Sequence, residues 1–324
     1  MKIIYEWKSD LADVIEQYTK EKKLIGFKFE QQSRYLRHFD SFYYYNGYNG
    51  INLTKLMLKE FIYKEEERPV SHYNKEVVMR NFAIYLNNHG YFVYVPEIHT
   101  LLPRSKFIPH IYTKEELQHF FHAIDYYPVT SNSYRNAVDP LLFRFLYGTG
   151  ARISEALNLT IEDVNLSDGI VTIRHAKNDK DRLIPITESL VVRMRIYMES
   201  FHRFSDNNTF VFPGSKMGHM DQSTANTHFR DYLLMADIPH TAKGPRIHDF
   251  RHGLAVACLK KWSLAGIDLT NMLPYLSAYM GHSDFRATQY YLRLTADLYP
   301  HILSKSEAEF GYVIPEGSCL YEES

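Results

Sequence analysis

Cationic, imidazole and phenol side chains that can act on a phosphate ester gather in four short segments of the second half of the sequence. In the first segment, LYGTGARISEALNL, Gly148 and Gly150 permit a tight turn, and a helix starts again at Arg152. A helix N-terminus favours phosphate, and the Arg152 guanidinium can donate two parallel hydrogen bonds to phosphate oxygens. Glu155, one turn later, is placed to hold that guanidinium. The alternative is an ordinary Arg–Glu pair on a helix surface.

The second segment is a turn between two predicted strands, GIVTIRHA and DRLIPI. Lys177 lies just past the first strand, where a turn can project its ammonium group into a groove. Lys180 and Arg182 lie nearby and are alternatives for the same role. The other interpretation is that the lysines are solvated turn residues.

The third segment, PRIHDFRHGLA, enters a predicted helix on which His248 and Arg251 are three residues apart and share one face. His252 follows His248 at i+4, a spacing that mimics the zinc-binding HExxH helix. Position 249 is Asp rather than Glu, however, and Arg251 would place a cation next to the metal. A zinc hydrolase that uses His248, His252 and His282 is therefore the less favoured alternative.

The fourth segment, YMGHSDFRATQYYLRL, carries His282 after a glycine and Tyr291 nine residues later. A tyrosine alone is a weak signal, since the chain has 26 of them and most tyrosines near helices serve packing. Tyr290 and the later Tyr299 also offer phenols. On a helix, Tyr290 would point about 100° away from Tyr291.

Together these side chains suit phosphoryl transfer without a metal ion. A phenol with a pKa near ~10 must lose its proton as it attacks. Charge that builds on the non-bridging oxygens is met by fixed arginine and histidine donors. The leaving alkoxide needs a proton, which a lysine or a histidine can give. We find no carboxylate cluster suited to magnesium, so cationic side chains would take its place.

In their order along the chain, the segments resemble the motifs of the tyrosine recombinase (phage integrase) family. ARISEALNL resembles the first-arginine motif, and HAKNDKDRLIPI resembles the hairpin with the catalytic lysine. HDFRH resembles the HxxR helix of the family, and MGHSDFRATQYYLRL resembles its final histidine-to-tyrosine segment. The resemblance spans about residues 100–300, and four separated matches in one order make it specific.

The resemblance implies the catalytic set Arg152, Lys177, His248, Arg251, His282 and Tyr291, with Glu155 orienting the first arginine. The arginines would clamp the scissile phosphate, the lysine would protonate the leaving 5′-oxygen, and the histidines would assist. The tyrosine would form a 3′-phosphotyrosyl link, with no cofactor, metal or ATP. The resemblance thus implies a site-specific DNA recombinase or integrase.

The match to the family leaves two choices open at the level of single residues. Asn178 stands where the family usually has glycine after the lysine, so Lys180 stays an alternative to Lys177 as the general acid. The nine-residue spacing from His282 favours Tyr291 over its neighbour Tyr290.

The elements that must position these residues indicate a mainly α (α+β) fold with a small β-hairpin sheet. In the first hundred residues, apolar residues recur at helical spacing near 9–24, 29–46, 53–65 and 72–90. Thr54 and Ser71 are candidate N-caps, and the many aromatic residues are expected to pack in a small bundle. Further on, Thr113 and Glu116 form a predicted capping box that opens a new helix.

These patterns predict a division of the chain into four parts. They are a helical core-DNA-binding domain at 1–100, a linker at 101–112, a catalytic domain at 113–305 and an acidic C-terminal tail at 306–324. The tail carries five acidic and no basic residues, whereas the parts before it are slightly basic. The net charge of −1 therefore understates the positive charge that residues 1–305 can present to DNA.

Composition limits the remaining possibilities. The 324 residues are 45% apolar and 23% charged, which excludes a wholly disordered or collagenous chain. No run approaches 18 uncharged apolar residues, so no membrane span is expected. The start, MKIIYEWKSD, lacks a signal-peptide core, and Cys258 and Cys319 do not suggest a disulfide framework. A reducing cytoplasm fits these features best.

The family resemblance also implies partners. They are double-stranded DNA recombination sites, a homo-tetramer on two such sites, and accessory DNA-bending or directionality proteins, without a membrane. The long spacer before His282 favours a transposon or integrative element over a chromosome-dimer resolvase. Such an enzyme would work in the bacterial cytoplasm, associated with the nucleoid. A non-catalytic DNA-binding relative that keeps the fold is the main alternative.

Overall fold

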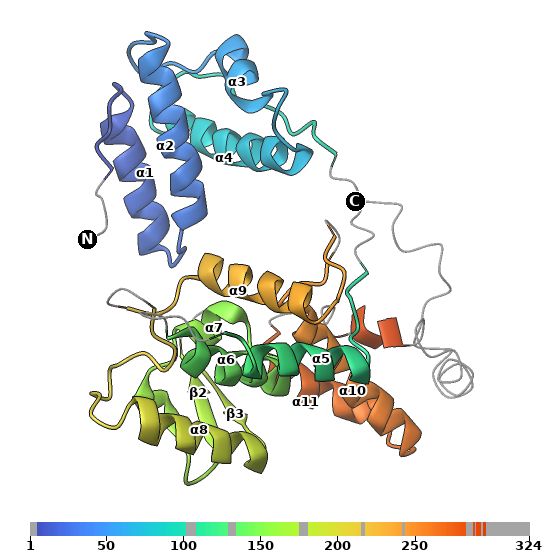
Figure 1. Ribbon diagram of the computed structural model, residues 1–324. Coiled ribbons are helices and arrows are strands. Elements are labelled where there is room, and N and C mark those ends of the chain that lie inside the picture. The colour runs from blue at the N-terminus through green and yellow to red at the C-terminus, as the bar shows by residue number, and fades with distance from the viewer. Residues whose placement is uncertain are drawn as a thin grey trace. The chain divides into compact units, whose positions relative to one another are not determined.

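The computed structural model describes residues 5–101, 108–128, 134–174, 181–214, 218–241, 244–282, 288, 290–292 and 294–295. The chain divides into two compact units, Met1–Lys106 and Phe107–Ser324. Helices form most of both units, and a small antiparallel sheet belongs to the second (Figure 1). The predicted mainly α fold with a small sheet is confirmed. No helix in the described ranges combines the length and apolar character needed to cross a bilayer.

The described helices of the first unit are α1 (Ala12–Leu24), α2 (Glu30–Tyr45), α3 (Lys55–Ile62) and α4 (Pro69–Asn88). Thr54 Oγ1 accepts a hydrogen bond from the backbone N–H of Met57 at 3.2 Å, so this predicted cap begins α3. The prediction for Ser71 is wrong, because α4 begins two residues earlier at Pro69. Proline suits a first helical position, since its φ is already helical and its missing N–H has no helical partner there.

Aromatic side chains form much of the core of the first unit, as the sequence predicts. Phe39, Tyr43 and Phe61 are buried, and the rings of Phe39 and Phe61 meet edge to face with centroids 4.9 Å apart. Tyr44 and Tyr45 stay exposed on the last turn of α2. Burial of the first group and exposure of the second follow from the helical period, which turns successive residues to different sides.

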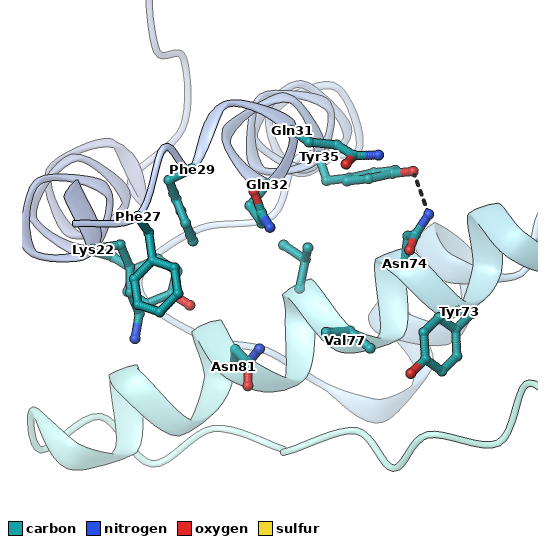
Figure 2. A pocket seen from close by; sticks show the side chains of 12 residues that line it. Lys22, Phe27, Phe29, Gln31, Gln32, Tyr35, Tyr73, Asn74, Val77 and Asn81 are labelled. Atoms are coloured by element: carbon teal, nitrogen blue, oxygen red, sulfur yellow. Dashed lines mark hydrogen bonds between the residues drawn. The ribbon is translucent and has the colours of Figure 1, made fainter. Parts of the chain in front are cut away.

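A pocket of about 270 Å³ lies between α1, α2 and α4 (Figure 2). Aromatic rings line it together with the polar side chains Lys22, Gln31, Gln32, Asn74 and Asn81. The amide groups can donate and accept hydrogen bonds at once, which makes this surface able to contact polar ligands.

The described helices of the second unit are α5 (Lys114–Asp125), α6 (Arg135–Thr149), α7 (Ile153–Leu157), α8 (Glu188–Phe201), α9 (Gln222–Met235), α10 (Asp249–Leu264) and α11 (Leu269–Met280), with a 3-10 turn, η1, at Ile161–Asp163. The predicted capping box at the start of α5 is confirmed. Thr113 Oγ1 accepts from the Glu116 N–H at 3.1 Å, and the Thr113 N–H donates to Glu116 Oε2 at 2.8 Å. Each side chain thus satisfies a backbone group that the helix leaves unpaired.

The sheet contains β1 (Val164–Asn165), β2 (Ile170–Ile173) and β3 (Arg182–Pro185) in the order β1-β2-β3, with both pairs antiparallel. The predicted hairpin is β2 and β3, whereas the short β1 was not predicted. In the hairpin, Val171 lies opposite Ile184 and Ile173 lies opposite Arg182. Val171, Ile173 and Ile184 are buried, so this face of the hairpin packs on the core.

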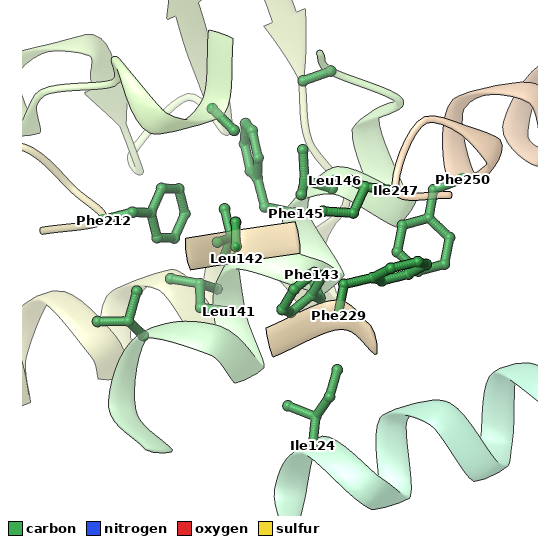
Figure 3. Packing of buried hydrophobic residues seen from close by; sticks show 14 of the residues in the cluster. Ile124, Leu141, Leu142, Phe143, Phe145, Leu146, Phe212, Phe229, Ile247 and Phe250 are labelled. Atoms are coloured by element: carbon green, nitrogen blue, oxygen red, sulfur yellow. The ribbon is translucent and has the colours of Figure 1, made fainter. Parts of the chain in front are cut away.

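The core of the second unit is built around α6, which contacts α5, α7, α8 and α10. Phe143 and Phe145 of α6 are fully buried in it, together with Phe229 of α9 and Phe250 of α10 (Figure 3). Each such ring removes a large apolar area from water, which fixes α6 firmly. The segment that follows α6 therefore starts from a rigid support.

Candidate active site

The first site segment is a turn that follows α6 and lies against α10. Gly150 ends α6 with φ at +61°, in the left-handed region that favours glycine. A Cβ atom at this position would lie 2.8 Å from Leu254 Cδ2 and 3.7 Å from Arg251 Cα. The turn therefore needs glycine for its backbone conformation and for its close approach to α10.

Gly150→Ala should lower the free energy of unfolding by about 1–2 kcal/mol, because alanine disfavours this backbone region and would crowd Leu254. Gly253→Ala is the matched control, since Gly253 lies inside α10 with open space around its Cβ position. A helical glycine replaced by alanine should gain roughly 0.5–1 kcal/mol. Urea unfolding measures both variants, and a loss of equal size in the two would contradict the explanation.

Arg152 lies directly before α7 and pairs with Glu155, as their spacing predicts. Arg152 Nη1 donates to Glu155 Oε1 at 2.7 Å, and the Arg152 backbone N–H donates to Oε2 at 2.8 Å. The Glu155 side chain is 6% exposed and that of Arg152 is 24% exposed. Arg152 Nη2 also donates to the carbonyl of Gly281 at 3.3 Å. The Glu155 carboxylate is thus the more buried partner, and the Arg152 guanidinium stays partly exposed to solvent.

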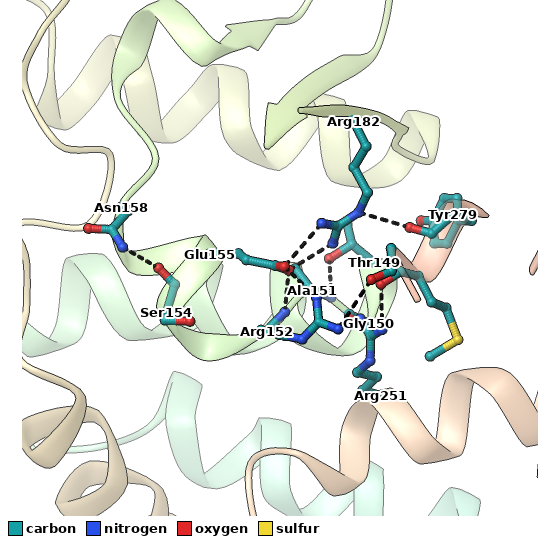
Figure 4. A network of polar contacts seen from close by, with 12 residues as sticks. Thr149, Gly150, Ala151, Arg152, Ser154, Glu155, Asn158, Arg182, Arg251 and Tyr279 are labelled. Carbon is teal, nitrogen blue, oxygen red and sulfur yellow. Dashed lines mark hydrogen bonds and ion pairs between the residues drawn. The ribbon is translucent and has the colours of Figure 1, made fainter. Parts of the chain in front are cut away.

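Arg182, named from the sequence only as an alternative to Lys177, forms a second pair with Glu155. Arg182 Nη1 donates to Glu155 Oε1 at 3.0 Å, and Nη2 donates to Oε2 at 2.7 Å. Its Nε donates to the carbonyl of Tyr279 at 3.1 Å. Figure 4 shows the carboxylate between the guanidiniums of Arg152 and Arg182. The reason is its place in β3, two residues before the buried Ile184 and on the same face of the strand.

The ion pairs also set the protonation of Glu155. Burial alone would raise the pKa of this carboxyl, but hydrogen bonds from Arg182 and Arg152 outweigh it and bring the pKa to about 2. The ordinary value is 4.5, so the folded chain binds fewer protons here than the unfolded chain. Glu155 therefore stabilises the fold above about pH 5, and this contribution is lost as the pH falls towards 2.

We expect the difference in unfolding free energy between wild type and Glu155→Gln to shrink by about 2 kcal/mol between pH 5 and pH 3. Over this range the unfolded glutamate takes up a proton while the folded one stays ionised. Denaturant unfolding of both proteins at several pH values measures the difference. A difference that stays constant with pH would contradict the low pKa of Glu155.

Arg251 is buried at the centre of the site, with 2% of its surface exposed. Its Nη1 donates to the carbonyl of Gly150 at 2.7 Å, and its Nη2 donates to the carbonyl of Met280. Burial, helped by the charge of Arg152, lowers the pKa of Arg251 to about 10, so the guanidinium stays charged at neutral pH. With five N–H groups in all, Arg251 can join these two backbone segments and still donate to a ligand.

Three histidines, His248, His252 and His282, lie near Arg251. Burial lowers the pKa of each to about 4, and neighbouring cationic groups add to the effect. His248 lies directly before α10 and keeps part of its surface open, while His282 Nδ1 lies 2.8 Å from Thr288 Oγ1. All three are neutral at pH 7, so each ring can donate one hydrogen bond and accept another.

Tyr291 is buried beside these groups, with 3% of its surface exposed. Its ring stacks on His282, with centroids 5.8 Å apart and planes 18° apart, and its centroid lies 5.5 Å from that of His252. Burial raises the pKa of the Tyr291 phenol, while the charge and a hydrogen bond of Arg251 act in the opposite direction. The neighbouring Tyr290 is 39% exposed. The fold therefore places the Tyr291 phenol next to the guanidinium of Arg251.

Residues 111–297 match the sequence model of the phage integrase family. The chain belongs to this family. This confirms the family resemblance of the four segments and makes the protein a site-specific tyrosine recombinase.

Known relatives of the recombinase match it along most of its length. It is 28% identical over 309 residues to y4rB of Sinorhizobium fredii, which is named as an integrase/recombinase, and the match covers 92% of this chain and 98% of y4rB. It is 28% identical over 293 residues to tyrosine recombinase XerA of Pyrococcus furiosus, covering 88% and 91%. The structure of the XerH site-specific recombinase bound to a palindromic difH substrate is similar with a TM-score of 0.61, at 20% identity, over 94% of this chain and 85% of XerH. That likeness concerns the fold.

Several predicted residues of the recombinase lie outside the described residues. They are Lys177, its alternative Lys180, the neighbouring Asn178, the distant Tyr299, Cys319 and the tail 306–324. Cys258 is a free cysteine. The predicted domain limits stay predictions, as do the roles of the site residues.

A zinc site finds no support in the described part of the recombinase. There, no three His, Cys, Asp or Glu side chains gather as metal ligands, although His248, His252 and His282 are all described. Arg251 lies near these histidines and would repel a cation. Within the described residues, the zinc-hydrolase alternative therefore has no ligand set.

Sequence reasoning named Arg182 only as an alternative to Lys177 and missed its pairing with Glu155. The available signal was strand alternation, because Arg182 and Ile184 share one face while Leu183, between them, is 62% exposed. The sequence segment DRLIPI does not show which of its faces is buried, since apolar side chains occur on both. Only packing against the core resolves that choice.

Proposed function

We propose that the recombinase cuts and rejoins DNA through a 3′-phosphotyrosyl intermediate on Tyr291. The observation that carries this proposal is the meeting of Tyr291 with Arg251 and Arg152, which come from three separate segments. A phosphodiester and a developing phenolate repel each other, and two guanidiniums at the same place offset that repulsion.

In the cleavage step, Tyr291 Oη attacks phosphorus and the bond from phosphorus to the 5′-oxygen breaks. The phenol loses its proton, and the 5′-oxygen gains one and leaves as a hydroxyl group. One phosphodiester thereby replaces another, so the bond energy is kept and neither ATP nor a metal ion is required. In rejoining, a 5′-hydroxyl from the partner duplex loses its proton and attacks phosphorus. The bond from phosphorus to Tyr291 Oη breaks, and the phenol oxygen takes a proton back.

Arg152 and Arg251 would bind the non-bridging oxygens of the scissile phosphate. Arg152 has the open side chain, and Arg251 is the buried one whose position backbone carbonyls fix. Lys177, or Lys180 in its place, would give its proton to the leaving 5′-oxygen. Glu155 orients Arg152 and does not meet the substrate.

His248 and His282 would hydrogen-bond the phosphate and assist proton movement. Because their pKa is about 4, both are unprotonated and only weakly basic at neutral pH. An anionic phosphate beside them favours the protonated form and raises their pKa. Binding of the substrate thus brings these imidazoles nearer to the range in which a group can both take and give a proton.

Both units of the chain would bind double-stranded DNA. Lys20, Lys23, Lys28 and Arg34 are exposed on the first unit and can contact phosphates. The amides that line its pocket, Gln31 and Gln32 among others, are of the type that pairs with the edge of adenine (Figure 2). If phosphate contacts dominate, affinity should fall steeply with salt.

The proposed assembly is a homo-tetramer on two DNA sites, with accessory DNA-bending or directionality proteins. Each chain supplies one attacking tyrosine, and full exchange between two duplexes cuts four strands. The long segment before His282, which forms the end of α10 and α11, supports a role for a transposon or an integrative element. The enzyme would then act on nucleoid DNA in the bacterial cytoplasm.

Trapping the intermediate tests this function. The protein is incubated, with EDTA present, with a pool of duplexes taken from the DNA that flanks its gene, each nicked near a candidate site. Loss of the short strand at the nick prevents rejoining, so a covalent adduct that survives denaturation should accumulate. DNA binding without an adduct would instead favour the alternative, a non-catalytic DNA-binding relative.

A further inference from the structure

Glu155 is the point where three segments of the site meet. It binds Arg152 from the turn after α6 and Arg182 from β3. Both guanidiniums also reach the end of α11, through the carbonyls of Gly281 and Tyr279. A single buried carboxylate therefore connects the first-arginine turn, the hairpin and the backbone next to His282 (Figure 4).

We propose that Arg182 is a positioning residue for DNA cleavage: it holds Glu155 in place, and Glu155 in turn directs Arg152 towards the scissile phosphate. This inference rests on the proposed function. It assigns a role to a residue that the catalytic set Arg152, Lys177, His248, Arg251, His282 and Tyr291 does not contain.

The contacts of Arg182 separate it from the arginines that would bind phosphate. Its two terminal nitrogens bind Glu155, and its Nε binds the Tyr279 carbonyl, so all three nitrogens donate inside the protein. Its side chain is 11% exposed, about half the exposure of Arg152. Arg182 is thus the inner guanidinium of the pair and Arg152 the outer one.

Packing against Gly281 holds the Arg182 guanidinium from another side. Gly281 has φ at +64°, and a Cβ atom there would lie 2.8 Å from Arg182 Nη1 and 2.9 Å from its Cζ. The guanidinium therefore lies directly on the backbone that precedes His282. Any shift of Arg182 would move both Glu155 and this backbone.

Arg182 also sets the net charge of the group that it forms with Arg152 and Glu155. Glu155 by itself would neutralise the charge of Arg152, so the pair would offer the bound phosphate no net attraction. With Arg182 paired to the same carboxylate, the group of three carries one net positive charge. Arg152 can then offer its attraction to the phosphate while Glu155 still fixes its direction.

The test measures the rate of Tyr291–DNA adduct formation on the nicked duplex. Arg182→Gln should slow it by roughly 10–100-fold, by analogy with the loss seen when groups that orient metal ligands are removed. Arg182→Lys, which keeps the charge but loses the paired hydrogen bonds, should fall between this variant and wild type. Arg174→Gln is the matched control, because it breaks another arginine–carboxylate pair at the same hairpin, with Asp163, and should leave the rate unchanged.

A double variant distinguishes a positioning role from direct phosphate contact. In a Glu155→Gln background, Arg182→Gln should have little further effect, because its target is already gone. If Arg182→Gln lowers the rate of adduct formation by the same factor in both backgrounds, Arg182 acts on the phosphate itself. That result would overturn the proposal. The double variant also leaves no unpaired charge in the interior, so it remains informative if Arg182→Gln alone folds poorly.

The pH profile provides a readout that general loss of structure would not produce. Without Arg182, Glu155 loses its strongest hydrogen-bond donor, and its buried carboxyl takes up a proton at higher pH. Cleavage by Arg182→Gln should then decline between pH 7 and pH 5 more steeply than cleavage by wild type, and the double variant should lose this decline. A wild-type rate and profile in Arg182→Gln would overturn the proposal. Absence of any adduct in wild type would instead overturn the proposed function.

Discussion

Tyr291→Phe should abolish the covalent protein–DNA adduct while DNA binding stays intact. The phenol oxygen is the atom that would form the bond to phosphorus, and phenylalanine lacks this oxygen. We expect adduct formation to fall by ~10⁵-fold or more, the scale on which loss of a catalytic nucleophile is felt. The substitution removes one oxygen from a ring that is 3% exposed and stacked on His282, so packing should be kept.

Tyr290→Phe is the matched control for this experiment. Tyr290 has the same side chain one residue earlier, but it is 39% exposed. Adducts are counted on denaturing gels, and binding is measured by gel shift with the intact duplex. An adduct that persists in Tyr291→Phe and disappears in Tyr290→Phe would move the nucleophile to Tyr290. Adducts in both variants would place it elsewhere in the chain.

Arg251→Lys should slow cleavage by about 10²–10³-fold, the loss typical when one donor to a developing charge is removed. Lysine keeps the positive charge, but its single ammonium group cannot reach the carbonyls of Gly150 and Met280 and also a phosphate oxygen. The effect should appear in the rate at saturating DNA, since the charge is needed most as the phenolate attacks.

Arg144→Lys is the control for the arginine-to-lysine change. Arg144 also donates from both terminal nitrogens, at 2.9 and 2.7 Å, but to Asp125. Its substitution should leave the cleavage rate within about twofold of wild type, because surface ion pairs contribute little. A full wild-type rate in Arg251→Lys, measured on the same DNA, would remove Arg251 from the catalytic set.

Local signals in the sequence predicted local structure well. The hydroxyl of Thr54 and the Thr113–Glu116 capping box begin α3 and α5, because capping depends on residues only a turn apart. Ser71 had the right side chain for a cap, but Pro69 started α4 before it. At α4 the proline, whose φ is fixed near the helical value, marks the helix start.

The family of this protein can be identified from the sequence alone, because four motifs in a fixed order carry that information without any coordinates. The sequence also predicted the hairpin and the pairing of Arg152 with Glu155, whose three-residue spacing suffices to bring them together. These features share one property: each depends on residues close together in the chain or on a pattern along it.

Two features of the site could not be predicted from the sequence: Glu155 is shared with Arg182, and Arg251 joins the carbonyls of Gly150 and Met280. These contacts connect segments that are far apart in the sequence. The spacing of residues along the chain does not encode them, since they depend on which face of β3 is buried and on how α10 and α11 pack beside the turn after α6. The burial that keeps the nearby histidines neutral has the same origin, because desolvation is a property of the packed core and not of the residue type.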